Sequence, residues 1–151
     1  MDVFGEFERL ARDLADRQIP CALIGGVAMA FHAIPRFTKD VDLLIKPEHL
    51  PAIQEAFTAR GYLPPGAPWT FPRTKLSLCR CVKPVADDEF FVDVLAAEAP
   101  ELAAIVDRAL LMDSPDHPPV RLARREDIVL LKKLRASPQD QADIALLECH
   151  E

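Results

Sequence analysis

The amino-acid sequence predicts an α/β protein with a mixed β-sheet, helices packed behind it and a helical C-terminal segment. Helix-type and strand-type hydrophobic patterns alternate over residues 1–98, and the patterns after residue 99 are mainly helical. The chain has 151 residues, of which 50% are hydrophobic and 28% are charged, which is the size and composition of one globular domain. We therefore expect one domain over 1–151, with a sheet core over 1–98 and a helical part over 99–151 that flanks a cleft.

The first elements follow from hydrophobic spacing and from breakers. Apolar residues recur at helical spacing from Phe4 to Leu14, which predicts an amphipathic helix that ends before Pro20. The apolar run Cys21–Ile24 predicts a short buried strand. It meets the pair Gly25-Gly26, which predicts a tight turn, and residues 27–32 continue as a helix.

The next segment combines a strand with acidic residues. Residues 40–45 predict a strand bounded by Pro47, with Asp40 and Asp42 two residues apart and therefore on one face. Apolar residues from Leu50 to Phe57 predict a helix that Gly61 caps at its C-terminal end.

The middle of the chain predicts a β-hairpin followed by helices. Residues 71–82 alternate as a half-buried strand, and residues 90–95 form the second strand, with Asp93 in its centre. The first strand is expected to have a polar, basic side made of Arg73, Lys75, Ser77 and Cys79. Helices are expected over 101–110, 126–135 and 138–149, with a short extended link near Val120.

Composition excludes several classes of function. The formal net charge of −6 argues against binding nucleic acid over the whole surface, so bulk DNA binding is not expected. The four cysteines form no CxxC pair and no zinc-type spacing, which favours a reducing cytoplasm. The N-terminal residues do not resemble a signal peptide, and no apolar run reaches the length of a membrane span, so we expect a cytoplasmic protein without a membrane partner.

Three carboxylates are the main candidates for chemistry. Asp40 and Asp42 on one strand face repel each other unless a cation compensates, and Mg²⁺ prefers such oxygen ligands. Asp93 on a neighbouring strand would complete a site for two metal ions that act on a phosphoryl group. The alternative is that Asp40 is a turn residue and Asp42 points to solvent.

The glycine pair is the second candidate feature. A strand that ends in Gly25-Gly26 lets the backbone approach a phosphate group closely. The alternative is a tight strand-to-helix turn without a ligand. Neither GxGxxG nor a P-loop is present, so the common nucleotide-binding folds do not explain the pair.

These motifs together resemble a known superfamily. The order is Leu23-Ile24-Gly25-Gly26, a spacer of thirteen residues (27–39), Asp40-Val41-Asp42-Leu43 and, later, Asp93 within Phe91–Leu95. This order resembles the signature of the DNA polymerase β-like nucleotidyltransferase superfamily. The segment 35–40 and the tail, from residues 126–128 through Lys132 to 138–144, resemble small bacterial members related to AbiEii-type toxins and antibiotic nucleotidyltransferases.

The resemblance implies a nucleotidyltransferase-type mixed sheet and transfer of a nucleotidyl group from an NTP to an acceptor hydroxyl, with two Mg²⁺ ions. It implies that Asp40, Asp42 and Asp93 are catalytic and hold the metal. Gly25, Gly26, Arg36, Thr38 and Lys132 would bind the nucleotide. The acceptor is left open between an RNA 3′ end, a protein and a small molecule such as an antibiotic, and a toxin-type protein would have an antitoxin partner.

Several alternatives remain at this point. Arg36 fits a solvated loop, Thr38 an extended backbone, and Lys132 a solvated helix face within 121–135, where six basic residues stand against two acidic ones. Asp140 fits a capping box that begins at Ser137. Trp69 fits either base stacking or a loop anchor. A domain of the same fold that binds nucleotide without turnover is the alternative function.

Overall fold

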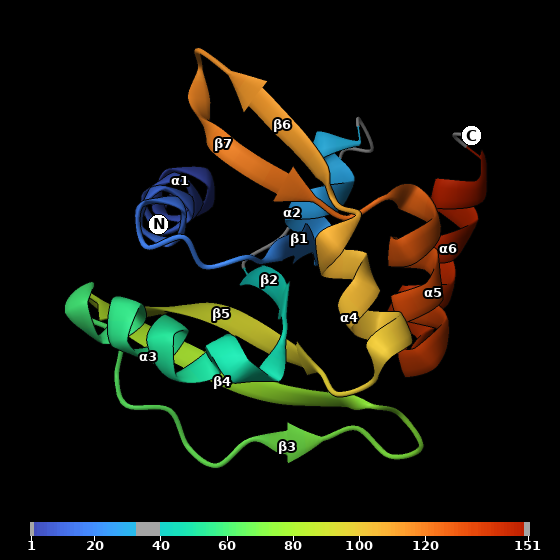
Figure 1. Cartoon of the computed structure of the whole chain (residues 1–151), viewed down its shortest axis with the longest axis horizontal. Helices are drawn as coiled ribbons and strands as arrows, with labels where there is room; N and C mark the ends of the chain where they lie inside the picture. Colours follow the sequence, from blue (N-terminus) through green and yellow to red (C-terminus); the bar gives the residue numbers. More distant parts are fainter. Residues whose placement is uncertain (1, 33–39, 150–151) are drawn as a thin grey trace.

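The computed structural model describes residues 2–32 and 40–149, which form a seven-stranded mixed sheet with helices on both faces (Figure 1). The predicted α/β class is confirmed. The helices are α1 (Val3–Asp16), α2 (Gly25–Phe31), α3 (Leu50–Ala59), α4 (Pro100–Asp107), α5 (Arg125–Arg135) and α6 (Pro138–Cys149), and a 3₁₀ turn, η1, covers Pro47–His49. The strands are β1 (Ala22–Ile24), β2 (Asp40–Ile45), β3 (Trp69–Thr70), β4 (Leu76–Val85), β5 (Asp88–Ala97), β6 (Leu110–Ser114) and β7 (His117–Leu122).

The strands follow the order β3-β4-β5-β2-β1-β7-β6, so segments far apart in sequence meet at the centre of the sheet. β2 pairs with β5 in parallel and with β1 antiparallel, and β5 pairs antiparallel with β4. β7 joins the other side of β1 in parallel through Leu23 and Leu122. The parallel pair β2 and β5 therefore lies in the middle, which is where the predicted acidic residues stand.

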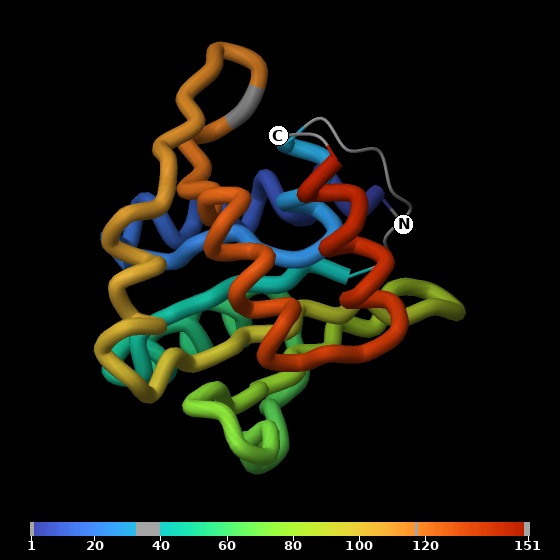
Figure 2. The backbone as a smooth tube through the Cα atoms, turned by 90° about the vertical axis from the view of Figure 1, so that its right-hand side faces the viewer, coloured from blue at the N-terminus to red at the C-terminus, as the bar shows by residue number. Residues whose placement is uncertain are grey.

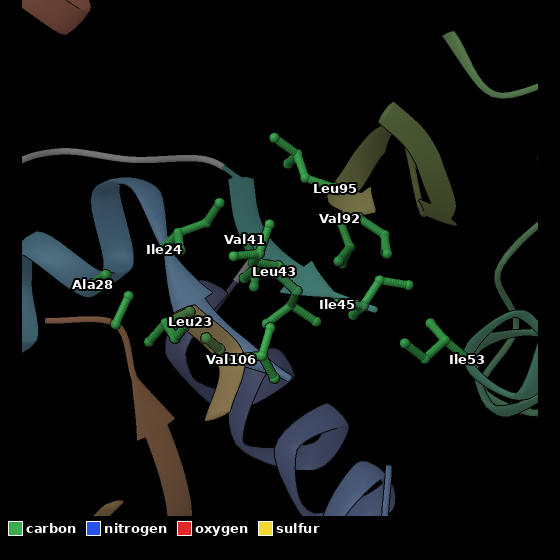
Figure 3. Close-up of a cluster of buried hydrophobic side chains, with 14 of the residues drawn as sticks. Leu23, Ile24, Ala28, Val41, Leu43, Ile45, Ile53, Val92, Leu95 and Val106 are labelled. Atoms are coloured by element: carbon green, nitrogen blue, oxygen red, sulfur yellow. The ribbon is translucent and has the colours of Figure 1, made fainter. Parts of the chain in front are cut away.

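Helices cover the two faces of this sheet. On one face, α1 packs with Leu23 and Leu43, and Gln54 of α3 donates to the sulfur of Cys79 at 3.6 Å. On the other face, α5 lies over Ile24 and Leu95, and α6 packs beside α5 (Figure 2). Figure 3 shows part of the buried apolar cluster that β1, β2 and β5 contribute to this core. None of the helices in the described ranges has the length and apolar character that crossing a membrane requires.

The C-terminal part differs from the prediction at one hairpin. The predicted helix over 101–110 ends at Asp107, and β6 and β7 form an antiparallel hairpin that extends the sheet (Figure 1). The sequence Leu110–Ser114 lacks the alternation of a strand, and β7 contains Pro118 and Pro119, which disfavour strands. The part from 99 to 151 is therefore not wholly helical.

The strand predicted over 71–82 also needs correction. β4 begins at Leu76, and residues 71–75 form a turn in which Thr74 donates its hydroxyl to the carbonyl of Phe71 at 2.9 Å. The side predicted to be polar is buried, because Ser77, Cys79 and Cys81 face the core beneath α3. Helices cover both faces of the sheet, so alternation along β4 does not separate core from solvent.

The remaining predictions of elements agree with the structure within a few residues. α1, α3, α5 and α6 are present, and Gly61 follows α3 with a left-handed φ of 91°, as a C-terminal cap requires. The glycine pair differs in detail, because Gly25 and Gly26 form the first turn of α2 instead of a turn before it.

Gly25 is required by its neighbour across the sheet. Its φ is +73°, in the left-handed region, and a Cβ there would overlap the carboxylate of Asp42 and lie 2.8 Å from its Cγ. Only glycine combines this backbone conformation with the space that the Asp42 side chain needs.

We predict that Gly25→Ala lowers the free energy of unfolding by about 1–3 kcal/mol, because alanine is strained at this φ and displaces Asp42. Gly66→Ala is the control, since nothing lies within 4 Å of the added Cβ. Urea unfolding of both variants measures the difference. Equal stability of the two variants would show that Asp42 does not constrain residue 25.

Candidate active site

Three charged side chains form a row across adjacent strands. Asp42 of β2 is opposite Asp93 of β5, and Asp93 is opposite Arg80 of β4. Residues directly opposite each other share a sheet face, and neighbouring strands are about 4.8 Å apart. Asp40 lies two residues before Asp42 and therefore faces the same way. The structure thus places the three predicted acidic residues together, on the face that α5 covers.

This row lines a cavity of about 190 Å³ between the sheet and the α5–α6 pair. Gly25 and Gly26 lie at its edge, and the helices contribute further polar side chains: Lys132, Arg135, Ser137, Gln139, Asp140 and Asp143. Among the described residues, five carboxylates and three cations line the cavity. Their formal charge is −2, which equals in magnitude the charge of one divalent cation.

Arg80 holds the third acid in a fork of two hydrogen bonds. Its Nε donates to Oδ1 of Asp93 at 2.8 Å, and its Nη2 donates to Oδ2 at 2.9 Å. The guanidinium also lies 5.0 Å from the centre of the Phe91 ring. The Asp93 side chain is only 10% exposed, whereas the Arg80 side chain is 50% exposed. Arg80 is therefore the partner in this pair that has room to move toward solvent.

The pKa of Asp42 is raised by this arrangement. Burial raises the pKa of its carboxyl group to about 7, and the charge of Asp93 raises it further than any other charged neighbour does. Arg135 and Lys132 act in the opposite direction, with smaller effects. Proximity to Asp93 and removal from water thus disfavour a full negative charge on Asp42.

Lys132 is placed by two acids of α6. Its Nζ donates to Oδ2 of Asp143 at 2.9 Å and lies 3.7 Å from Oδ1 of Asp140. All three residues are buried, with exposed fractions of 6% or less. Asp140 also accepts from the hydroxyl and backbone amide of Ser137, while its own amide donates to the Ser137 hydroxyl. The predicted capping box is present, and the same residue also contributes to the cavity.

Sequence reasoning missed two cations of the site. Arg80 is not among the candidates, because the sequence predicts the basic side of this strand on the opposite face. Arg135 was grouped with a solvated basic stretch, although it lies one helical turn after Lys132 and faces the same cavity. Asp143 has a signal in the sequence, because it lies in the segment 138–144 that resembles the AbiEii-related proteins. Arg36 and Thr38 lie outside the described residues.

The donor chemistry of the site suits a divalent cation, with one condition. Carboxylate oxygens are the ligands that Mg²⁺ prefers, and burial together with the charge of Asp93 raises the pKa of Asp42, so a cation would stabilise its charged form. In the described part of the chain, no group of three His, Cys, Asp or Glu side chains converges closely enough to hold a metal. Each oxygen of Asp93 accepts one hydrogen bond from Arg80, so a cation there competes with Arg80 for Asp93.

We predict that Arg80→Gln destabilises the metal-free protein by about 1–3 kcal/mol, because Asp93 is then a buried carboxylate without its cation. Mg²⁺ should reduce the difference in stability between Arg80→Gln and wild type, since the cation replaces the lost positive charge. Thermal melting with a chelator and with Mg²⁺ measures this change. Arg12→Gln, on the exposed side of α1, is the control. If Mg²⁺ leaves the difference in melting temperature between Arg80→Gln and wild type unchanged, the assignment of the acidic row as a metal site would be contradicted.

A second prediction concerns pH. The folded protein keeps a proton on Asp42 up to about pH 7, whereas the unfolded chain loses it near pH 4. Stability from this group is therefore present below about pH 4 and is lost as pH rises to about 7. Asp42→Asn removes this loss, so the free energy of unfolding of the variant should exceed that of wild type by an amount that grows from about pH 4 to about pH 7. A tenfold change in proton affinity is worth about 1.4 kcal/mol, so a gain of about 2–4 kcal/mol is expected at neutral pH.

Melting of both proteins from pH 4 to pH 8 in chelator gives the comparison. Asp87→Asn, in the exposed turn between β4 and β5, should show no such dependence. An advantage of Asp42→Asn that is the same at every pH would contradict the raised pKa.

Comparison with known proteins adds to this geometry. No family model and no curated protein matches the chain. Two structures of the antibiotic-resistance factor ANT(2'')-Ia are similar to it. The solution structure has a TM-score of 0.63 at 16% identity over 97% of this chain and 84% of that one. A complex with adenylyl-2''-tobramycin has a TM-score of 0.59 at 14% identity over 95% and 86%.

A protein of Thermotoga maritima assigned to the nucleotidyltransferases has a TM-score of 0.59 at 14% identity, and the match covers 96% of this chain and 92% of that one. At these identities the similarity establishes the fold. The chain therefore has the fold of the nucleotidyltransferases.

Proposed function

We propose that this protein transfers a nucleotidyl group from a nucleoside triphosphate to an acceptor hydroxyl in a metal-dependent reaction. The observation that carries the proposal is the direct pairing of Asp42 with Asp93 across β2 and β5, with Asp40 on the same face of the cavity. The fold of ANT(2'')-Ia, which has been captured with an adenylylated antibiotic, supports the same class of reaction.

The reaction forms one bond and breaks another at the α-phosphorus. The acceptor oxygen attacks this atom, the bond to the bridging oxygen of the β-phosphate breaks, and pyrophosphate leaves. Asp40 and Asp42, joined by Asp93, would hold Mg²⁺, which when bound stabilises the triphosphate charge and lowers the pKa of the acceptor hydroxyl. Asp93 is also the candidate to accept the hydroxyl proton, for which its position matters more than its pKa.

The assignment requires that Arg80 change partner. Both oxygens of Asp93 accept hydrogen bonds from Arg80, so opening of this fork would make Asp93 more available to the metal and to the acceptor proton. A triphosphate offers the guanidinium an alternative anion, and bidentate contact with phosphate suits its geometry. Arg80 would then neutralise Asp93 in the free protein and bind the triphosphate in the complex.

Lys132 of α5 and Gly25 of α2 each fit a role in binding the triphosphate. Asp143 and Asp140 hold the ammonium group of Lys132 in a fixed position. From this position the group would contact a phosphate of the substrate. Gly25 leaves room for the Asp42 carboxylate at the edge of the cavity, where the triphosphate would approach. The AbiEii-like subgroup, a toxin-type role and an antitoxin partner are further predictions from the resemblance.

A domain that binds nucleotide without turnover is the less favoured function. Asp42 keeps a raised pKa beside Asp93, which is an unfavourable arrangement in the folded protein. A bound cation would relieve it in either kind of domain, and turnover is favoured because a protein of the same fold, ANT(2'')-Ia, has been captured with an adenylylated antibiotic.

We predict that the wild-type protein labels an acceptor when incubated with α-phosphate-labelled NTPs, Mg²⁺ and cellular RNA, protein and small-molecule fractions. Asp42→Asn should reduce labelling by about a hundredfold or more, because it removes charge that stabilises the transition state. Asp87→Asn is the matched control, since it makes the same change on the surface.

Binding of the NTP can be measured separately by its effect on thermal stability. Wild type should be stabilised by NTP with Mg²⁺ and much less by NTP with chelator. Equal labelling by wild type and Asp42→Asn would overturn catalysis by this site. Stabilisation that does not depend on the metal would count against the metal-dependent reaction.

A further inference from the structure

An aromatic pair lies at the β3 edge of the sheet, near the candidate active site. Trp69 of β3 is opposite Leu78 of β4, and Leu78 is two residues before Arg80. Opposite residues share a face, and so do residues two apart on one strand. Trp69 therefore lies on the same face of the sheet as Arg80 and the catalytic acids. Phe71 follows β3, and its backbone amide donates to the carbonyl of Leu76 at 3.0 Å, so the pairing with β4 continues and Phe71 shares this face.

The two rings contact each other and connect to the cavity through one arginine. The centres of Trp69 and Phe71 are 4.5 Å apart, with an angle of 71° between the rings. The guanidinium of Arg135 lies 5.6 Å from the centre of the Phe71 ring. Arg135 also lines the cavity that holds Asp42 and Asp93. In Figure 2 the turn between α5 and α6 lies beside the loop that follows β3.

The Trp69 ring is open to a ligand. Trp69 is 53% exposed, although large aromatic side chains in a protein of this size are usually buried. Two cations, Arg73 and Lys75, follow in the exposed turn that leads to β4. The edge thus combines a free aromatic ring with positive charge, which is the combination that binds single-stranded nucleic acid.

The position of the pair relative to the acids indicates which substrate it contacts. Gly25, where the triphosphate would approach, lies beyond Asp42 on the β1 side of the row. Trp69 lies on the opposite side, two strands or about 10 Å from β5. The acceptor hydroxyl would be activated by Asp93. A ring on the Asp93 side therefore belongs with the acceptor instead of with the NTP.

We propose that Trp69 and Phe71 form a stacking subsite for a base of the acceptor, and that the acceptor is the end of a single-stranded RNA. This inference rests on the proposed nucleotidyl transfer. A terminal ribose hydroxyl of the RNA attacks the α-phosphorus, pyrophosphate leaves, and the proton goes to Asp93. The base stacks on Trp69, and Arg135 contacts the backbone phosphate between the subsite and the acids. An acceptor without a base, such as an aminoglycoside, cannot make this base–ring stacking.

The chain offers a direct probe of the subsite, because Trp69 is its one tryptophan. Its fluorescence should be quenched in a saturable way by a short single-stranded oligoadenylate or oligocytidylate. Fluorescence anisotropy of a labelled RNA oligonucleotide gives the affinity without relying on the tryptophan. Trp69→Leu should weaken RNA binding by about 5- to 150-fold, the range that stacking of one base supplies. Trp69→Phe should retain most of the affinity.

The controls separate the subsite from the rest of the protein. Leu111→Ala removes an exposed apolar side chain from β6 and should leave RNA binding unchanged. Stabilisation by NTP with Mg²⁺ should be the same in wild type and in Trp69→Leu. NTP binding with no RNA binding, or full quenching of Trp69 by NTP alone, would overturn the acceptor subsite. So would RNA binding that Trp69→Leu leaves unchanged.

The same data keep the two proposals distinct. RNA binding that depends on Trp69, together with no stabilisation by NTP at all, would support the subsite and overturn nucleotidyl transfer. Saturable quenching of Trp69 by an aminoglycoside alone, with no RNA present, would place a small cationic acceptor at this edge and contradict the stacking role.

Discussion

The parallel register between β2 and β5 is the constraint on which the rest of the site depends. It places Asp42 directly beside Asp93, about one strand spacing away, on a face that α5 covers. Asp93 is buried and Asp42 is partly buried, and two like charges at this separation oppose folding, so the neighbouring structure has to compensate. Arg80 is in register to neutralise Asp93, and Gly25 leaves space for the carboxylate of Asp42. The β4–β5 pairing supplies Arg80 and the β1–β2 pairing brings Gly25 beside Asp42, so both features answer the charge that the β2–β5 register concentrates.

The neighbouring cations neutralise the acidic row only in part, and this partial neutralisation suits catalysis. Asp93 has a cation with ideal fork geometry, whereas the pKa of Asp42 remains raised to about 7. A fully neutralised cluster would have little affinity for a further cation. The cavity keeps a formal charge of −2 among its described residues, and the half-exposed Arg80 can leave without unfolding its strand. Partial neutralisation thus keeps the protein folded and leaves the acids available to a ligand.

The sequence predicts the acidic row better than it predicts what surrounds it. Asp40, Asp42 and Asp93 can be found because acids are depleted in strands, so their presence there is a local signal. Arg80 has no such signal, since its role depends on the register of a hairpin whose start was placed five residues too early. The β6–β7 hairpin was missed because Pro118 and Pro119 contradict strand propensity, and pairing with β1 overrides that propensity. Tertiary pairing decides these cases, and it is not visible in a local pattern.

The α5–α6 pair determines the electrostatics of the row that it covers. Ala136 has a left-handed φ of 53°, which ends α5 and turns the chain so that α6 packs back beside it. This turn brings Asp143 to Lys132 and fixes the lysine inside the cavity. The same helices exclude water from Asp42, and this burial is the largest cause of its raised pKa. Lys132 and Arg135 are one turn apart, so the helix that buries the acids also carries the cations that limit the effect. The Arg135 guanidinium then extends the charged surface to Phe71, which joins the acidic row to the aromatic edge of the sheet.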